Sequence, residues 1–277
     1  FRHIIAKLKK EYSLISPEEW LDRLKNDELT DFDRCLTFDD NIKSQIDIAL
    51  PILEENDIKA FFFIYTGMYF GQLPRLEIYR LFRLKYFDTF NDFFACFLDR
   101  MNQELAIDFS KISNEFPKDY LIRYEFYSLN ERVFRFIRDE IMNEKQYNIV
   151  MDSMILDFTT LEELSASIWM SENDIFELAK KGHEIGLHSV SHPTNMSRKS
   201  DIKQKEEYQE NKNHLEELCG KVIRSIAYPS GSYNRYTLEL MKQLGIETGF
   251  RSDDFSGSNK ALEIGRIDGA TLNSIIQ

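Results

Sequence analysis

The sequence predicts an α/β protein built on a parallel sheet, with a mostly helical insertion in the middle of the chain. Short apolar runs alternate with segments of helical spacing before residue 70 and again after residue 170. Between them, at about residues 71–165, the chain is dense in Phe, Tyr, Leu and Arg and has no glycine after Gly71. We expect one domain over residues 1–277, whose sheet is either an open sheet or a βα barrel. Both arrangements gather a site at the carboxyl ends of the strands.

The first predicted elements are a helix and a strand that ends in two acidic residues. Ser16 before Pro17 is typical of a helix start, because Ser can cap the first turn and Pro is tolerated at its first position. Residues 34–38 form a short apolar run bounded by Asp residues, which predicts a buried strand. The end of that strand delivers Asp39 and Asp40 to a loop.

A helix over residues 43–55 and a buried strand over residues 58–65 follow. A strand, a helix and a strand at this spacing predict parallel pairing, because parallel strands need a long crossover connection. In the insertion, residues 78–84 and 133–142 have the apolar spacing of helices. The alternative is that the insertion continues the α/β repeat. Its many Phe residues are expected to form a core rather than a surface that stacks on sugars.

The alternating pattern resumes after the insertion. It predicts helices over residues 172–181, 201–218 and 236–244, and strands over residues 183–188, 222–228 and 246–250. Gly182, Gly220 and Gly245 follow the three helices, and glycine is the usual residue behind a helix end.

Composition and charge argue against several classes of function. Hydrophobic residues make up 43% and charged residues 30% of the chain, which is ordinary for a folded globular protein. The formal charge of −12 disfavours nucleic acid as a partner, because its binders carry clustered Lys and Arg. Three widely spaced cysteines indicate neither a disulfide framework nor a thiolate metal site. No apolar run is long enough to span a membrane. Cytoplasmic placement is expected by default, with a targeting segment removed upstream of Phe1 as the alternative.

Thr37-Phe38-Asp39-Asp40 places two carboxylates side by side at a strand end. Successive side chains of a strand point in opposite directions, so two adjacent acids cannot share one task. One of them can bind a metal while the other transfers protons. A helix cap is the alternative for an isolated pair of this kind.

His188 and His192 form the second candidate group. Two imidazoles at this spacing can bind one ion, and imidazole with carboxylate suits zinc and other late first-row divalent metals. Two of the five histidines lie in this loop, which follows a predicted strand as the Asp39 loop does. We expect Asp40, His188 and His192 to bind one divalent metal, zinc foremost, with cobalt, nickel or manganese as alternatives. Asp39 is then the expected general base, and a backbone N–H of the loop over residues 228–231 would stabilise the oxyanion.

Three motifs together resemble the NodB-type polysaccharide deacetylases, carbohydrate esterase family four. They are Thr37-Phe38-Asp39-Asp40, then Gly182-His183-Glu184-Ile185-Gly186-Leu187-His188-Ser189-Val190-Ser191-His192-Pro193, then Ala227-Tyr228-Pro229-Ser230-Gly231-Ser232-Tyr233-Asn234. The resemblance covers about residues 31–70 and 168–268, and it implies a distorted (β/α)7 barrel. It also implies that Asp39 is the base, that Asp40, His188 and His192 hold the metal, and that Tyr228, Pro229, Ser230 and Gly231 line the substrate groove. The third motif is similar to that of exopolysaccharide and surface-glycan deacetylases.

The chain departs from the family pattern at several positions. Ala227 stands where many members have an Arg that orients the catalytic Asp, and Ser230 stands where Tyr is common. We expect Arg251 or Arg266 to supply the missing cation, and we place Arg266, which lies in a segment similar to the family's late strand, in the substrate site. The late His that often serves as general acid is absent after Arg266, which leaves the pair Asp253-Asp254 as candidates.

The resemblance implies a hydrolase that removes an N-acetyl or related N-acyl group from an amino sugar of a polysaccharide or its precursor. Two alternatives stay open: an inactive relative that keeps the metal and only binds sugar, and a hydrolase of small amides or formamides. Among the other histidines, His183 faces away from His188 by strand alternation and is expected to pack or form a hydrogen bond. His3 and His214 lie in charged helical surroundings and are expected to be solvated.

Overall fold

The computed structural model describes residues 1–122, 127–253, 260–269 and 272, and the chain divides into two compact units. One unit comprises Phe1–Gln72 and Trp169–Gln277, and the other comprises Leu73–Ile168. The bounds of the second unit differ by a few residues from those expected for the insertion, about residues 71–165.

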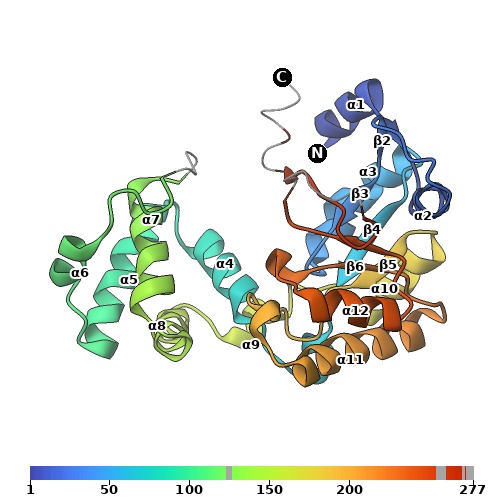
Figure 1. The fold of residues 1–277 in the computed structure, drawn as a ribbon. Coiled ribbons are helices and arrows are strands. Elements are labelled where there is room, and N and C mark those ends of the chain that lie inside the picture. The colour runs from blue at the N-terminus through green and yellow to red at the C-terminus, as the bar shows by residue number, and fades with distance from the viewer. Residues whose placement is uncertain (123–126, 254–259, 270–271, 273–277) are drawn as a thin grey trace. The chain divides into compact units, whose positions relative to one another are not determined.

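A five-stranded parallel sheet in the order β3-β4-β5-β6-β7 forms the centre of the first unit (Figure 1). Its strands are Leu36–Phe38 (β3), Ala60–Ile64 (β4), Glu184–Leu187 (β5), Ser225–Ala227 (β6) and Thr248–Phe250 (β7). An isolated parallel bridge between Phe250 and Ile264 extends the sheet beyond β7. Strand order follows chain order, as expected of successive βα units, and the curled parallel sheet with its helices confirms the predicted α/β fold of the distorted-barrel type.

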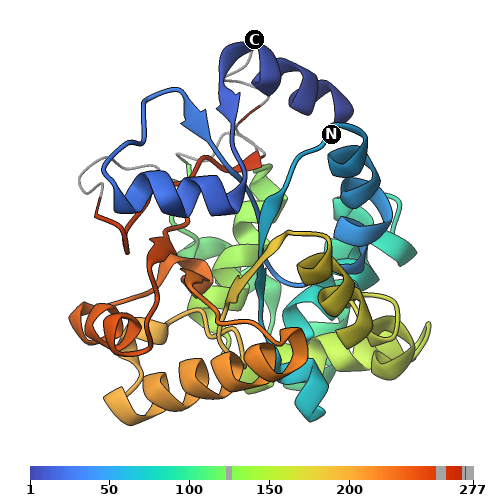
Figure 2. The same cartoon turned by 90° about the vertical axis from the view of Figure 1, so that its right-hand side faces the viewer.

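Helices of the first unit precede or connect these strands. They are α1 (Arg2–Glu11), α2 (Pro17–Lys25), α3 (Leu50–Glu55), α10 (Glu172–Lys180), α11 (Asp201–Cys219) and α12 (Arg235–Gln243), with short helical turns η2 (Gly67–Phe70), η4 (Met196–Arg198) and η5 (Pro229–Gly231). The predicted cap is present, because the Ser16 hydroxyl accepts the Glu19 N–H at 3.2 Å. Helix α11 packs on β5 and lies beside both α10 and α12, and Figure 2 shows it next to α12.

Two predicted elements differ from the structure. The strand expected over residues 34–38 is split, because Asp33–Arg34 (β2) pairs instead with Ser13–Leu14 (β1) in a separate two-stranded sheet. The buried Asp33 carboxylate bonds to Arg23 and to the Thr30 N–H, which fixes the chain there. The helix expected over residues 43–55 starts with a π-helical turn, η1 (Gln45–Ala49), directly before Pro51, whose missing N–H removes one α-helical hydrogen bond.

Strand β4 is buried on both faces, as its unbroken apolar run predicts. Phe62 and Ile64 belong to the main core between the sheet and its outer helices. Phe61 and Phe63 pack on the other face against Phe250, with ring centroids 5.2 and 5.4 Å apart. Since both faces are filled, the sheet is a rigid base for the loops at its carboxyl edge.

All the regular elements described in the second unit are helices. They are α4 (Arg75–Tyr86), α5 (Phe90–Leu105), α6 (Phe109–Glu115), α7 (Leu129–Phe136), the π-helical η3 (Ile137–Ile141), α8 (Glu144–Leu156) and α9 (Leu161–Ser165). Their core is aromatic, with the ring of Phe134 placed 5.0 Å from that of Phe97 and 5.4 Å from that of Phe93. These Phe side chains are therefore committed to packing.

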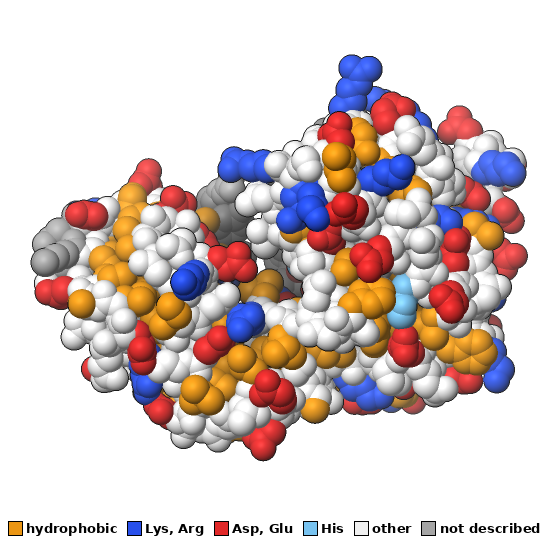
Figure 3. Space-filling view, turned by 90° about the horizontal axis from the view of Figure 1, so that it is seen from below, with side chains coloured by type: hydrophobic (Ala, Val, Ile, Leu, Met, Phe, Trp, Pro, Cys, Tyr) orange, Lys and Arg blue, Asp and Glu red, His pale blue; other side chains and the backbone are white. Residues whose placement is uncertain are grey.

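Charged side chains of both signs cover the surface. On the face shown in Figure 3, basic side chains are scattered among acidic ones rather than gathered into one patch. Within the described ranges, none of the helices combines the length and the apolar character that crossing a membrane requires.

Candidate metal centre

The predicted acids and His188 lie at the carboxyl edge of the sheet, directly after the strands that carry them. Asp39 and Asp40 follow β3, and His188 follows β5. Asp40, with φ 72°, and His192, with φ 50°, have left-handed backbone conformations that non-glycine residues rarely adopt. Strain of this kind persists only where the surrounding structure holds it, and it is concentrated at functional sites.

Asp40, His188 and His192 form one group of candidate ligands. Asp40 Oδ1 lies 3.4 Å from His188 Nε2 and 3.2 Å from His192 Nε2, and the three ligand atoms all lie within 4.8 Å of one another. Tetrahedral ligands about 2.1 Å from a zinc ion are separated by about 3.4 Å, so this donor set fits one divalent cation of that size. With three protein ligands, a position stays open for water or substrate.

Hydrogen bonding fixes the orientation of the His188 ring. Its Nδ1 lies 2.7 Å from the Ala227 carbonyl oxygen, and its side chain is buried. Because a carbonyl can only accept, Nδ1 donates to it, and Nε2 faces Asp40 as the nitrogen that could bind a metal. The ring of His192 lies 4.9 Å from that of His188 and 5.4 Å from that of the buried Tyr65, which limits its rotation.

Arg266 holds the second carboxylate. Its Nη1 and Nη2 donate to the two oxygens of Asp39, both at 2.7 Å, and Nη1 also lies 3.2 Å from the Thr37 hydroxyl. The Nε of Arg266 donates to the Arg251 carbonyl at 2.7 Å. Of the two candidate cations, Arg266 is therefore the one that pairs with Asp39. The Arg251 side chain lies 3.5 Å from Asp253 instead. The structure gives Arg266 a role in orienting Asp39.

The surroundings of Asp39 favour its ionised form. Burial alone would raise the pKa of this carboxyl, but the charges of Arg266 and His188 and the hydrogen bonds from Arg266 outweigh it and hold the pKa below its ordinary value. Asp39 is therefore a carboxylate near neutral pH, fixed beside the three candidate ligands and available to accept a proton.

The loop over residues 228–231 offers one backbone donor. The Tyr228 side chain is buried, and its hydroxyl donates to the Leu262 carbonyl at 2.8 Å, so the phenol is committed to the fold. Of the backbone, the Tyr228 N–H bonds to Phe250, Pro229 has no N–H, and the Gly231 N–H bonds to Tyr228. Ser230 is left as the loop residue whose N–H makes no hydrogen bond within the described chain.

The remaining histidines and acids have varied surroundings. His183 is buried and its Nδ1 accepts the Ala60 N–H at 3.2 Å, as expected of a packing residue. His214 departs from the solvated state expected for it, because it stacks on Tyr69 and lies 3.1 Å from a Glu172 oxygen. Asp253 pairs with Arg251, and Asp254 lies outside the described residues.

Two side chains that contact the loop over residues 188–192, the candidate metal-binding loop, were not found from the sequence. Glu207 and Asn211 lie on α11, and both bond to the segment between His188 and His192. The sequence of α11 did contain an indication of such contacts, because polar Gln204 and Asn211 lie on its buried face among apolar residues. Buried polar side chains need partners, but a single sequence does not say which ones.

The fold and the site together define a class: an α/β protein with a curled parallel sheet and a candidate mononuclear metal centre at its carboxyl edge. The family model described as polysaccharide deacetylase matches residues 154–249, which include both His188 and His192. The search of curated proteins found no match. Over this segment the chain is therefore similar to the polysaccharide deacetylase family.

Solved structures show the same fold over nearly the whole chain. The deacetylase PplD of Streptococcus pyogenes, in complex with acetate, is 20% identical with a TM-score of 0.56, covering 96% of this chain and 78% of its own. IcaB from Ammonifex degensii is 15% identical with a TM-score of 0.56, and the match covers 99% of this chain and 85% of IcaB. A de-N-acetylase from Aggregatibacter actinomycetemcomitans is 13% identical with a TM-score of 0.54, covering 99% and 87%.

Proposed function

We propose that this chain is a metal-dependent hydrolase that removes an N-acetyl or related N-acyl group from an amino sugar of a polysaccharide or its precursor. The observation that carries the proposal is the pairing of an ionised, Arg266-bound Asp39 with the group formed by Asp40, His188 and His192. The match of residues 154–249 to the polysaccharide deacetylase model supports the substrate class.

The side chains divide the chemistry among them. Asp40, His188 and His192 would hold a divalent cation, with zinc the best fit, which would supply polarisation of the carbonyl group and activation of water. Asp39 accepts the proton of the attacking water, and Arg266 keeps its carboxylate in position during that transfer. The Ser230 N–H, which has no partner among the described residues, donates to the oxygen on which negative charge develops.

The leaving amine needs a proton, and the chain has no histidine after Arg266. Asp39 has just accepted a proton when the C–N bond breaks, so we assign it the return of that proton to the nitrogen. Asp253 is a weaker donor for this step because its side chain is 44% exposed and pairs with Arg251.

The test measures acetate released from a panel of N-acetylated amino-sugar oligomers of different linkage. We expect release that stops on chelation, returns with added zinc or cobalt, and is abolished in Asp39→Asn while metal binding persists. Metal binding without release from any oligomer would favour the inactive sugar-binding relative instead. Release from small soluble amides alone would favour the amide hydrolase.

A further inference from the structure

Helix α11 contacts the candidate metal-binding loop through Asn211, which is completely buried. The Asn211 Oδ1 accepts the backbone N–H of His188 at 3.1 Å. Its Nδ2 donates to the Ile64 carbonyl at 3.0 Å and to the Thr66 hydroxyl at 3.1 Å. One side chain therefore joins the carboxyl ends of β4 and β5 at the point where His188 leaves the sheet.

Glu207, one helical turn before Asn211, binds the middle of the same loop. One carboxylate oxygen accepts the N–H groups of Val190 at 3.0 Å and Ser191 at 2.8 Å, and the other accepts the Ser191 hydroxyl at 2.6 Å. Hydrogen bonds to an ionised acceptor are shorter and stronger than neutral ones. The loop therefore has a charged anchor between its two histidines.

The loop conformation needs such an anchor. Ser189, with φ 66°, and His192, with φ 50°, flank the segment that Glu207 binds. Left-handed conformations of non-glycine residues cost about 1–3 kcal/mol each and persist when the surroundings over-determine them. The same backbone turn sets where the His192 imidazole lies relative to that of His188.

We propose that Glu207 and Asn211 are positioning residues of the metal centre, through which α11 holds the loop so that both imidazole Nε2 atoms face one cation. The inference rests on the proposed function of this site, but metal binding tests it without any substrate. Neither side chain touches the cation position in this account, because each acts through the backbone of the loop.

Glu207→Gln is the most informative variant. The amide keeps the size of the side chain and can still accept both backbone N–H groups while its NH2 donates to the Ser191 hydroxyl, so the variant removes the charge that strengthens these bonds. Mutation of groups that orient metal ligands typically lowers metal affinity about 10- to 100-fold, and we expect a loss near the lower end of that range. Asn211→Asp removes the donors to Ile64 and Thr66 and should act in the same direction.

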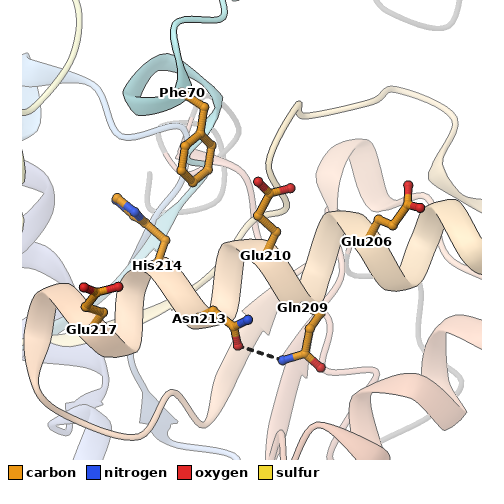
Figure 4. Close-up of a pocket in the computed structure, with 7 residues that line it drawn as sticks. All are labelled: Phe70, Glu206, Gln209, Glu210, Asn213, His214 and Glu217. Carbon is orange, nitrogen blue, oxygen red and sulfur yellow. Dashed lines mark hydrogen bonds between the residues drawn. The ribbon is translucent and has the colours of Figure 1, made fainter.

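Glu210→Gln is the matched control. Glu210 lies on the same helix, three residues further along, and its replacement by Gln removes the same charge as Glu207→Gln. It is exposed and lines a shallow groove with Phe70 and His214 (Figure 4), and the hydrogen bonds described for the loop over residues 188–192 do not involve it. We expect its metal affinity to equal that of the unaltered protein.

The experiment titrates the metal-free protein with Co²⁺, followed by visible absorption, and with Zn²⁺ by calorimetry. Thermal unfolding in chelator shows whether each variant folds. Ser191→Ala removes only one of the three donors to Glu207 and serves if Glu207→Gln does not fold; a loss of a few-fold in affinity is then expected.

Weaker Co²⁺ binding with an altered spectrum in Glu207→Gln, but not in Glu210→Gln, supports the proposal. Equal affinity in both variants and the unaltered protein overturns it, as does an equal loss in both, which would indicate a general effect of charge. If the unaltered protein binds neither ion, the proposed function fails together with this inference. If it binds metal but releases no acetate, only the proposed reaction fails.

Discussion

Replacing Arg266 with Ala should remove most of the catalytic activity without removing the metal. Arg266 makes two 2.7 Å hydrogen bonds to Asp39, and the two side chains are only 15% and 26% exposed. Hydrogen bonds to charged groups contribute about 1.5–3 kcal/mol each, and solvent access at this partly exposed pair reduces that value. We expect a loss of about 2–4 kcal/mol of transition-state stabilisation, or about 30- to 1000-fold in kcat/KM.

The assay compares kcat/KM for acetate release in Arg266→Ala, Arg266→Lys and Arg224→Ala, each with its Zn²⁺ affinity. Lys keeps the charge but cannot bind both oxygens of a carboxylate, so Arg266→Lys should retain intermediate activity. Arg224 also pairs with a carboxylate, that of Glu184, but at the opposite end of the sheet, so Arg224→Ala should stay near full activity. Activity of Arg266→Ala within threefold of the unaltered protein would refute the role assigned to Arg266.

Three further predictions concern the fold and the ligands. Burial and the nearby Lys59 lower the pKa of His183 to about 4, so the unfolded chain binds more protons below pH 6.5 and the folded state loses stability as pH falls. Between pH 7.5 and 5 the free energy of unfolding should fall by about 2 kcal/mol from this group, measured by urea unfolding; His183→Gln should lack that portion, and exposed His3→Gln should keep it. Gly186→Ala should destabilise by about 1–3 kcal/mol in the same assay, because its Cβ would lie 2.5 Å from the Phe63 ring; an unchanged urea midpoint would contradict this packing. His192→Ala should bind Zn²⁺ at least about 100-fold more weakly by calorimetry, and undiminished affinity would remove His192 from the ligand set.

Local patterns predicted most of the fold because most of its elements are locally determined. The unbroken apolar run of β4 and the Ser16 cap of α2 both carry their signal within a few residues. The break between β2 and β3 could not be predicted in this way. It depends on the burial of Asp33 against Arg23 and Thr30, and on pairing with a strand some twenty residues away.

The candidate metal ligands were predictable because histidine is rare in this chain and each of the three lies in a loop that follows a strand. Asp40 and His188 are brought together by parallel pairing of β3, β4 and β5, which the strand pattern already implied. Arg266 was one of two candidate cations, and only the fold shows which of them reaches Asp39. Glu207 could not be found among the many Glu residues of a charged helix, because its role depends on the turn taken by a distant loop.

The most direct test of this account is a crystal structure of the protein grown with Zn²⁺ or Co²⁺, with anomalous data collected at the absorption edge of the metal. We expect one anomalous peak bonded to Asp40 Oδ1, His188 Nε2 and His192 Nε2, with Asp39 beside it but bound to Arg266. An empty site at saturating metal, or a peak coordinated by Asp39 in place of Asp40, would contradict the account.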